Sequence, residues 1–196
     1  DDGGGGDDPN VQTIAEARVD GTGATVTVSG TVTRAFGAYA RIQDESGTTG
    51  ASGLVIRQTE GPNATDFRDD IANGNLVPGT ELEVTGTLSE FNNLLQINDD
   101  DLQSFTIGST GSVPAPQEVE LNTLQTNGED YESELVKVVN LEFPSATGTF
   151  ENGRNYDVND GTATLTFRVQ QSNESDLDGE SIPTGTFTYE GVVGQF

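Results

Sequence analysis

The chain has 196 residues, which is room for one large domain or two small ones. Its net charge is −25, and a field of that sign repels phosphates, so nucleic acid is an unfavourable partner. His, Cys, Met and Trp are absent, which excludes disulfides, thiolate or imidazole metal ligands, Cys nucleophiles and Ser-His-Asp chemistry. Lys137 is the only lysine, and acid excess with so little lysine is typical of proteins that stay soluble in high salt.

The composition also indicates an all-β, exported protein. There are 25 glycines, many Thr and Val residues, and no long apolar helical pattern. No stretch of about 20 apolar residues exists, so we expect no membrane span. The chain does not begin with methionine, and residues 1–12 open as DDGGGGDDPN, like the spacer that follows an export signal. We therefore expect a flexible acidic, glycine-rich tail and a location outside the cell or on its surface, after removal of a signal peptide.

Residues 13–97 are predicted to form a five-stranded barrel. A lead-in at Val11–Arg18 is followed by three short strands, a short helix and two more strands. Gly30 and Gly86 lie inside strands, where glycine marks a sharp bend. Five bent strands with a helix between the third and fourth are the pattern of an OB-fold barrel. In chain order the predicted elements are Ala24–Arg34, Ala38–Asp44, Leu54–Gln58, the helix Asp66–Ala72, and two strands within Leu76–Ile97 that meet at the turn Asn92-Asn93.

The second half repeats this layout after a linker at residues 98–117, which ends in Val113-Pro114-Ala115-Pro116. Residues 118–196 are the second OB-like domain. The final stretch, Ile182–Phe196, matches the start of the Leu76–Ile97 stretch and stops where the closing strand would begin. The sequence therefore predicts two tandem five-stranded barrels, of which the second lacks its closing strand. The other matched segments are Glu134–Phe143 with Ala24–Arg34, Asn155–Asp160 with Tyr39–Asp44, and Thr164–Val169 with Leu54–Gln58.

Four segments carry a resemblance to a known class of module: TIAEAR (Thr13–Arg18), VSGTVT (Val28–Thr33), IQDESG (Ile42–Gly47) and PGTELEVTGTLSEFNNLLQI (Pro78–Ile97). They resemble the OB-fold-like modules of exported bacterial proteins, including extracellular nucleases and surface proteins of Bacteroidetes-like bacteria. The resemblance covers nearly all of residues 13–196. It implies the fold and export, and it says less about activity, because one fold serves many functions.

One alternative function is a ligand-binding accessory module of a secreted enzyme. An OB face that binds nucleic acid or glycan uses exposed aromatic and basic side chains. Tyr39 and Arg41 on the second predicted strand, with Arg57 on the third, form the best such group in this chain. The same side chains also suit a simple core or rim, so this hypothesis stays second.

Chemistry at a metal or a catalytic pair has little support in the sequence. Calcium needs six to eight oxygen ligands, and Asp176, Asp178 and Glu180 around Gly179 are the best candidates. No complete EF-hand loop accompanies them. A tandem of small barrels offers no obvious deep cleft for two catalytic carboxylates, so we expect no enzyme activity and no cofactor, with Ca²⁺ as the one open case.

The leading hypothesis is a non-enzymatic structural protein that assembles with copies of itself. A barrel without its closing strand exposes an edge that pairs with another chain. A strand given by the next copy makes a head-to-tail contact that does not close, and so gives a filament or surface layer. The predicted acceptor edge is Gly191, Val192, Val193 and Phe196, and the predicted donor residues are Val11, Gln12, Thr13, Ile14 and Ala15. The tail at residues 1–12 is itself a possible donor strand, because its glycines let the main chain approach a neighbour closely.

Overall fold

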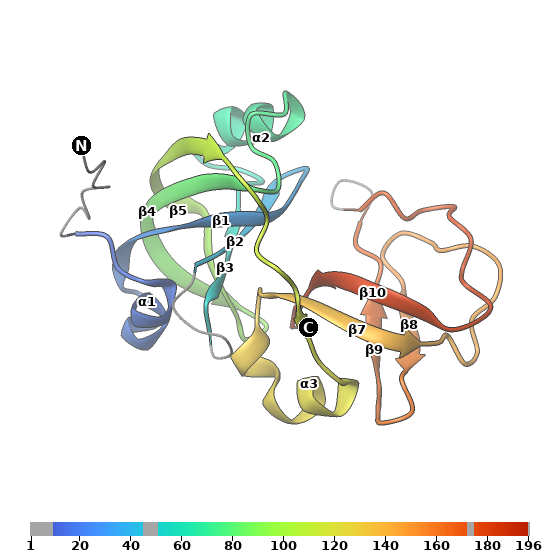
Figure 1. Cartoon of the computed structure of the whole chain (residues 1–196). Helices are drawn as coiled ribbons and strands as arrows, with labels where there is room; N and C mark the ends of the chain where they lie inside the picture. Colours follow the sequence, from blue (N-terminus) through green and yellow to red (C-terminus); the bar gives the residue numbers. More distant parts are fainter. Residues whose placement is uncertain (1–9, 45–50, 172–174, 196) are drawn as a thin grey trace, which may run out of the picture.

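The computed structural model of the chain describes residues 10–44, 51–171 and 175–195. Its two halves lie beside each other: a closed barrel, and a smaller part made of two sheets (Figure 1). The expectation of an all-β protein is corrected to mostly β, because three α-helices accompany the strands. The helices are α1 (Ile14–Asp20), α2 (Ala64–Ala72) and α3 (Leu121–Asn127), and a 3₁₀ turn, η1 (Gly128–Tyr131), follows α3.

The first half is a closed barrel with strand order β1-β2-β3-β5-β4, which confirms the predicted five-stranded barrel. β1 pairs with both β2 and β4, and this closes the sheet. β5 runs parallel to β3 and antiparallel to β4. Helix α2 connects β3 to β4 as the sequence predicts, with Asn63 at its N-cap. The strands are β1 (Thr25–Phe36), β2 (Tyr39–Gln43), β3 (Gly53–Arg57), β4 (Thr80–Phe91) and β5 (Leu94–Thr110).

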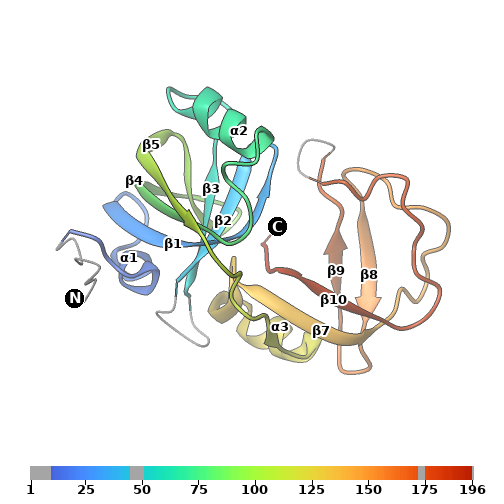
Figure 2. The same ribbon diagram turned by 45° about the horizontal axis from the view of Figure 1, so that its top comes forward.

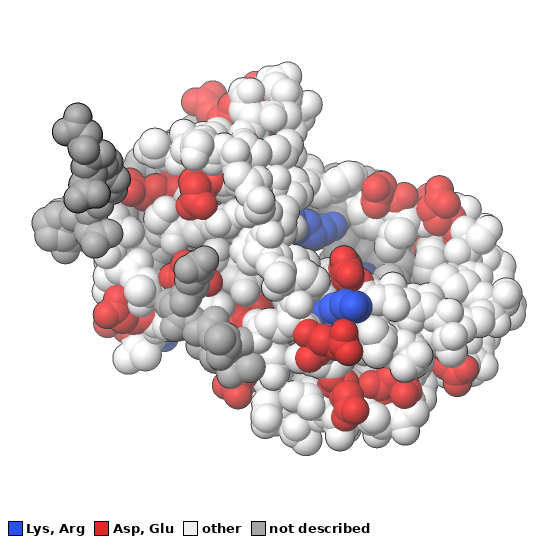
Figure 3. Space-filling view, viewed as in Figure 1, with Lys and Arg blue, Asp and Glu red and all other residues white. Residues whose placement is uncertain are grey.

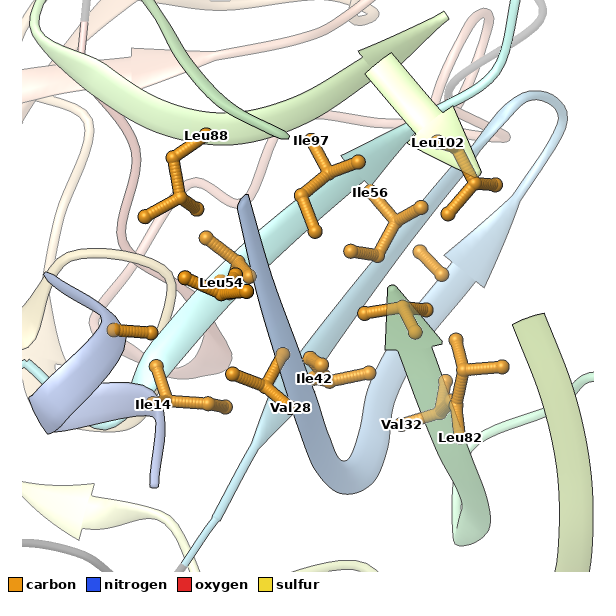
Figure 4. Close-up of a cluster of buried hydrophobic side chains, with 14 of the residues drawn as sticks. Ile14, Val28, Val32, Ile42, Leu54, Ile56, Leu82, Leu88, Ile97 and Leu102 are labelled. Carbon is orange, nitrogen blue, oxygen red and sulfur yellow. The ribbon is translucent and has the colours of Figure 1, made fainter. Parts of the chain in front are cut away.

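Aliphatic side chains from all five strands and from α1 fill the barrel (Figure 4). Val26, Val28 and Val32 point inward from β1, since alternate residues of a strand face the same side. The two strand glycines are required by close approaches. A Cβ on Gly30 would lie 3.1 Å from the backbone of Gln43, and one on Gly86 would lie 2.6 Å from Ile97 Cγ2.

Strand β5 is much longer than the closing strand that the sequence predicts. After the pairing of Leu94–Ile97 it bends at Asp99, whose φ is 43°, and continues along β4 to Thr110. The barrel therefore takes up residues from the range 98–117, which the sequence pattern assigns to a linker. The sequence pattern does not predict this part of the strand, because an acidic run follows Asn98 and the apolar residues on its inward side are only Leu102, Phe105 and Ile107.

The second half contains the predicted strands in two small sheets instead of a second closed barrel. One sheet has the order β10-β7-β6 and the other pairs β8 with β9. Between β7 and β8 the described residues make a single bridge, Glu142 with Asn159, so the two sheets are barely joined. The strands are β6 (Gln117–Glu118), β7 (Leu135–Leu141), β8 (Asn155–Asn159), β9 (Thr164–Arg168) and β10 (Phe187–Val192).

The pairing of β7 with β10 repeats the pairing of β1 with β4. Val26 faces Gly86 in the first half, and Val136 faces Gly191 in the second. The end of the ladder is repeated as well. Leu88 N–H donates to the Ala24 carbonyl (2.8 Å) in the first half. Val193 N–H donates to the Glu134 carbonyl (3.1 Å) in the second.

Two buried carboxylates just before β7 join the two halves. Glu132 Oε1 accepts from Arg18 Nη1 of α1 (2.7 Å) and from the backbone N–H of Leu95 (3.2 Å). Glu134 Oε1 accepts from the N–H and the hydroxyl of Ser52 (2.8 and 2.7 Å). Both carboxylates have 0% exposure, and buried charges are tolerated only where such partners meet them.

Candidate functional site: the free edge of the second half

The position of β5 has no counterpart among the described residues of the second half. In the first half β5 covers the edges of both β3 and β4. In the second half, β9 pairs only with β8, and β10 only with β7, within the part of the chain that the structure describes. Yet β9 and β10 remain neighbours, because the rings of Phe167 and Tyr189 meet at 5.8 Å in a T-shaped contact. The space between β9 and β10 therefore corresponds to the position that β5 occupies in the first half.

The free edge of β10 presents main-chain groups for pairing. Val193 faces the β7 side, where it donates to Glu134 and accepts from Ser133 N–H (2.9 Å). Because hydrogen-bonded residues alternate along an antiparallel strand, Gly191 also faces β7. Glu190 and Val192 then turn their N–H and C=O groups to the free side, where the Val192 carbonyl already accepts one hydrogen bond from the Tyr189 hydroxyl (3.3 Å). Their counterparts in the first half are Thr85 and Thr87, and Thr85 pairs with Ser104 of β5.

Aromatic rings form the floor of this place and hold the second half together without a fifth strand. Phe143 stacks on Phe187 at 5.0 Å and meets Phe150 edge to face at 5.4 Å. Several rings of the cluster are only half-buried, which marks a core with one side uncovered. The half-buried rings are Tyr156, Phe167, Phe187 and Tyr189.

Basic side chains lie next to the free edge. Figure 3 shows blue side chains in and beside a hollow between the two halves, on a face where acidic side chains otherwise dominate. β10 runs along the border of this hollow in the same view (Figure 1). Burial raises the pKa of the Tyr189 phenol, and the charges of Arg41 and Arg34 act against that rise. Arg34 pairs with Arg41 across β1 and β2, and Arg41 Nη1 donates to the Val193 carbonyl just beyond β10 (3.2 Å), so positive charge of the barrel lies at this end of the edge.

The predicted acceptor residues are partly engaged within the chain. Gly191 and Val192 belong to β10, and the main chain of Val193 is bound to the segment before β7. Arg41 Nη1 also donates to the Val193 carbonyl (3.2 Å). The fourth predicted residue, Phe196, lies outside the described residues. The available edge is thus the β10 strand itself, ahead of Val193.

The predicted donor residues lie in their own barrel. Gln12 bridges to Val28, and its N–H donates to the Thr27 carbonyl (2.8 Å). Thr13 caps α1 in a capping box with Glu16. Ile14 has 0% exposure and points into the core beside Val28 and Ile42 (Figure 4). Val11 and Ala15 flank these residues and are half-buried. A donor made of this segment would have to give up a cap and a core side chain, so the donor has to be sought elsewhere.

The structure separates the predicted ligand face. Tyr39 and Arg57 stay together, since Arg57 Nε donates to the Tyr39 hydroxyl (2.9 Å). Arg57 also forms an ion pair with Asp99, whose pKa is lowered: burial opposes ionisation, but hydrogen bonds from Glu60 and Thr59 outweigh it. Arg41 turns to the second half and donates to Ser133 Oγ (2.8 Å). Its long-range partner could not be read from the strand pattern.

The predicted calcium ligands are not gathered. Asp176, Asp178 and Glu180 are exposed, and Asp178 Oδ1 accepts from the backbone N–H of Asn152 (2.9 Å). Over the described ranges, no group of three or more His, Cys, Asp or Glu side chains is placed to hold a metal ion. None of the helices in those ranges is long and apolar enough to cross a membrane. No protein-family model matches the chain, and no curated protein matches it significantly.

Proposed function

We propose that the chain is a non-enzymatic, exported structural protein that assembles head to tail by β-strand complementation into a filament or surface layer. The observation that carries the proposal is the repeat itself. The second half keeps the β1–β4 and β2–β3 pairings of the barrel as β7–β10 and β8–β9, but its described residues put no strand in the place of β5. A strand from another copy fits that place.

The energetics of strand addition support this proposal. An incoming strand gains main-chain hydrogen bonds from Glu190 and Val192 on one side and from the free edge of β9 on the other. It also covers the half-buried rings of Phe167 and Tyr189 and removes apolar surface from water. Because donor and acceptor are different parts of the chain, the contact is heterologous, and it repeats into an open fibre where the rotation between copies does not close a ring. This is the geometry of a fibre.

The rival function, a ligand-binding accessory module of a secreted enzyme, has less support. Two of its three residues have internal tasks: Arg41 joins the halves, and Arg57 pairs with Asp99. The net charge of −25 repels nucleic acid as well. No specific contact favours a glycan. Export and the OB-like resemblance remain part of the proposal, supported by the composition and by the barrel topology.

A proline on the free edge tests the proposal. Glu190→Pro removes an N–H that faces the free side and leaves the β7 ladder intact, and proline is tolerated on strand edges. Glu190→Ala is the matched control, because it removes the same carboxylate and keeps the N–H. Negative-stain electron microscopy and light scattering in high and low salt follow the polymers, and circular dichroism checks folding.

We expect fibres from the native chain and from Glu190→Ala, and single particles of 20.6 kDa from Glu190→Pro. The concentration needed for assembly should rise at least roughly tenfold in the proline variant, which corresponds to about 1.4 kcal/mol. A native chain that stays monomeric under all conditions contradicts the proposal. Fibres that form equally well with the proline would show that assembly uses another surface.

A further inference from the structure

Gly86 of β4 and its counterpart Gly191 of β10 leave room for different side chains. In the first half a Cβ on Gly86 would lie 2.6 Å from Ile97 Cγ2, so Ile97 of β5 lies directly over this glycine. In the second half a Cβ on Gly191 would lie 2.2 Å from the Tyr189 hydroxyl oxygen. In the first half, a side chain of β5 thus occupies the space above Gly86. In the second half, Tyr189 of the same strand occupies the corresponding space above Gly191.

The counterpart of Tyr189 explains this exchange. Val84 occupies the same position in β4, opposite Val28, as Tyr189 does in β10, opposite Val138. Valine is short and leaves room for Ile97. Tyr189 reaches across Gly191 until its hydroxyl donates to the Val192 carbonyl (3.3 Å). A strand entering the second half therefore needs an extended main chain but only a very small side chain at this point.

The surroundings of the place select for negative charge. Arg41 donates to the Val193 carbonyl just beyond β10 (3.2 Å), Arg34 is its pairing partner on β1, and the chain has only eight basic residues in all. Elsewhere the chain repels acidic segments, since it carries 33 acidic residues. An extended segment with small residues in its middle and acidic residues at its ends fits this place best.

Resting on the proposed function, we infer that residues 1–9 of one copy, DDGGGGDDP, fill the place of the missing strand in the second half of the next copy. Gly3–Gly6 allow the main chain to approach the Tyr189 ring. The aspartates on both sides of the glycines are attracted by the positive field of Arg34 and Arg41, while Arg41 keeps its hydrogen bonds to Ser133 and Val193. The donor begins just before the bridge of Gln12 with Val28, so the barrel of the donor copy keeps its own cap and core.

The donor segment belongs to a different copy because residues 1–9 are too short to reach β10 of their own chain. Nine extended residues span about 30 Å at most. About six of them have to lie along β10, which leaves about 10 Å to arrive there. The start of the described chain and α1 lie on the side of the barrel away from β10 (Figure 2). The barrel stands between them, so the segment reaches a neighbour and not its own second half.

Two variants with complementary defects test the inference. The first lacks residues 1–9 and keeps its acceptor; every described residue except Asn10 then has its native chain neighbours. The second is Glu190→Pro, which keeps its donor and loses its acceptor. We expect each alone to stay monomeric and the mixture to give a one-to-one heterodimer of about twice 20.6 kDa by light scattering.

Each other outcome has a distinct meaning. Deleted chains that still form fibres overturn the inference about the donor and leave the proposed function standing. If both variants are monomeric and their mixture does not pair, the inference is also overturned. If Glu190→Pro alone still forms fibres, the proposed function fails, and the inference fails with it.

The size of the donor residues is tested by a rescue. Replacing Gly3–Gly6 by valine raises β-propensity, but the branched side chains meet Tyr189. We expect the heterodimer Kd to rise at least about tenfold, and to recover when the acceptor carries Tyr189→Val, which copies Val84 of the first half. Tighter binding of the valine donor to the native acceptor overturns the inference.

The charge of the donor site is tested by Arg34→Gln in the acceptor, with Arg154→Gln as the matched control. Arg154 carries the same charge on an exposed part of the second half, where it pairs with Glu151 (2.7 Å). We expect the Kd to rise roughly threefold for Arg34→Gln at 0.1 M salt and to stay unchanged for Arg154→Gln. Equal effects of the two variants overturn the assignment of an acidic donor.

Discussion

The first half of the chain surrounds its core, whereas the described residues of the second half leave several rings of its core only half-buried. Both halves begin with a helix held by the same kind of bond. Asp44 Oδ2 accepts from Ile14 N–H at the start of α1 (2.6 Å), and Asp160 Oδ2 accepts from Leu121 N–H at the start of α3 (2.8 Å). The two halves therefore share this helix bond, and they differ in how completely their strands are joined into one sheet.

The hydrophobic cores of the two halves are built from different kinds of side chain. The barrel core is aliphatic except for Phe67 and the half-buried Phe105 that meets it, and it depends on β5 to bring in Leu95, Ile97 and Leu102. The second core depends on aromatic rings that contact one another across the sheets. Large rings bury much area with few strands. Aromatic contacts can thus hold together a half whose described residues form two small sheets.

The largest effect is expected where the two halves meet. Glu132→Ala leaves the Arg18 guanidinium, whose side chain is 12% exposed, without its carboxylate. Loss of one partner of a buried pair costs about 3–5 kcal/mol. We expect the single unfolding transition in calorimetry to split, with the open half melting first.

The control for this variant is Glu118→Ala, which breaks the exposed pair with Lys137 (3.3 Å). An exposed pair contributes at most about 1 kcal/mol, so the transition should stay single. One transition in Glu132→Ala, shifted no more than in the control, would contradict a joining role for this carboxylate.

The next largest effect is expected at Gly86, and it is compared with the effect at its counterpart Gly191. Gly86→Ala puts a Cβ 2.7 Å from the backbone carbonyl of Asp101 as well as against Ile97, inside a closed barrel. We expect a loss of about 3 kcal/mol. Gly191→Ala meets only the Tyr189 ring, which can swing into the uncovered place, so we expect about 1 kcal/mol. Urea unfolding measures both, and equal losses would show that the second half is as closed as the first.

Local patterns predicted much of this architecture. The repeat of Gly86 as Gly191, and of Ile42-Gln43-Asp44 as Val158-Asn159-Asp160, placed four segments of each half in register, and the observed pairings agree with that alignment. The valine alternation around Gly30 predicted the bent first strand. Each of these signals lies within a short stretch of the sequence, so it can be recognised without knowing the fold.

The long-range contacts could not be predicted in this way. Arg41 looked like a ligand residue because its strand position faces outward, but its partner, Ser133, is distant in sequence. Ile14 looked like a donor residue because it follows the tail, but α1 carries it into the barrel. Glu132 and Glu134 resemble any other acidic pair in a chain with 33 acidic residues. Their burial follows only from the packing of the two halves.

The smallest effect concerns the helix bonds that both halves share. Burial opposes ionisation of Asp160, but hydrogen bonds from Leu121 N–H and from Thr162 outweigh it and lower its pKa to about 2. A carboxylate with a lowered folded pKa stabilises the fold above its unfolded pKa near 3.8, and this contribution is lost as the pH falls toward 2.

Asp160→Asn should accordingly cost about 1 kcal/mol at pH 7 and almost nothing at pH 2, as judged from urea midpoints across the pH range. Asp157→Asn, an exposed neighbour, is the control and should change little at either pH. In the first half Asp44→Asn removes the corresponding bond to Ile14, whose side chain is sealed in the barrel. If Asp160→Asn speeds hydrogen exchange in α3 while Asp44→Asn leaves α1 protected, then closure by β5, and not the shared helix bond, makes the first half the more rigid of the two.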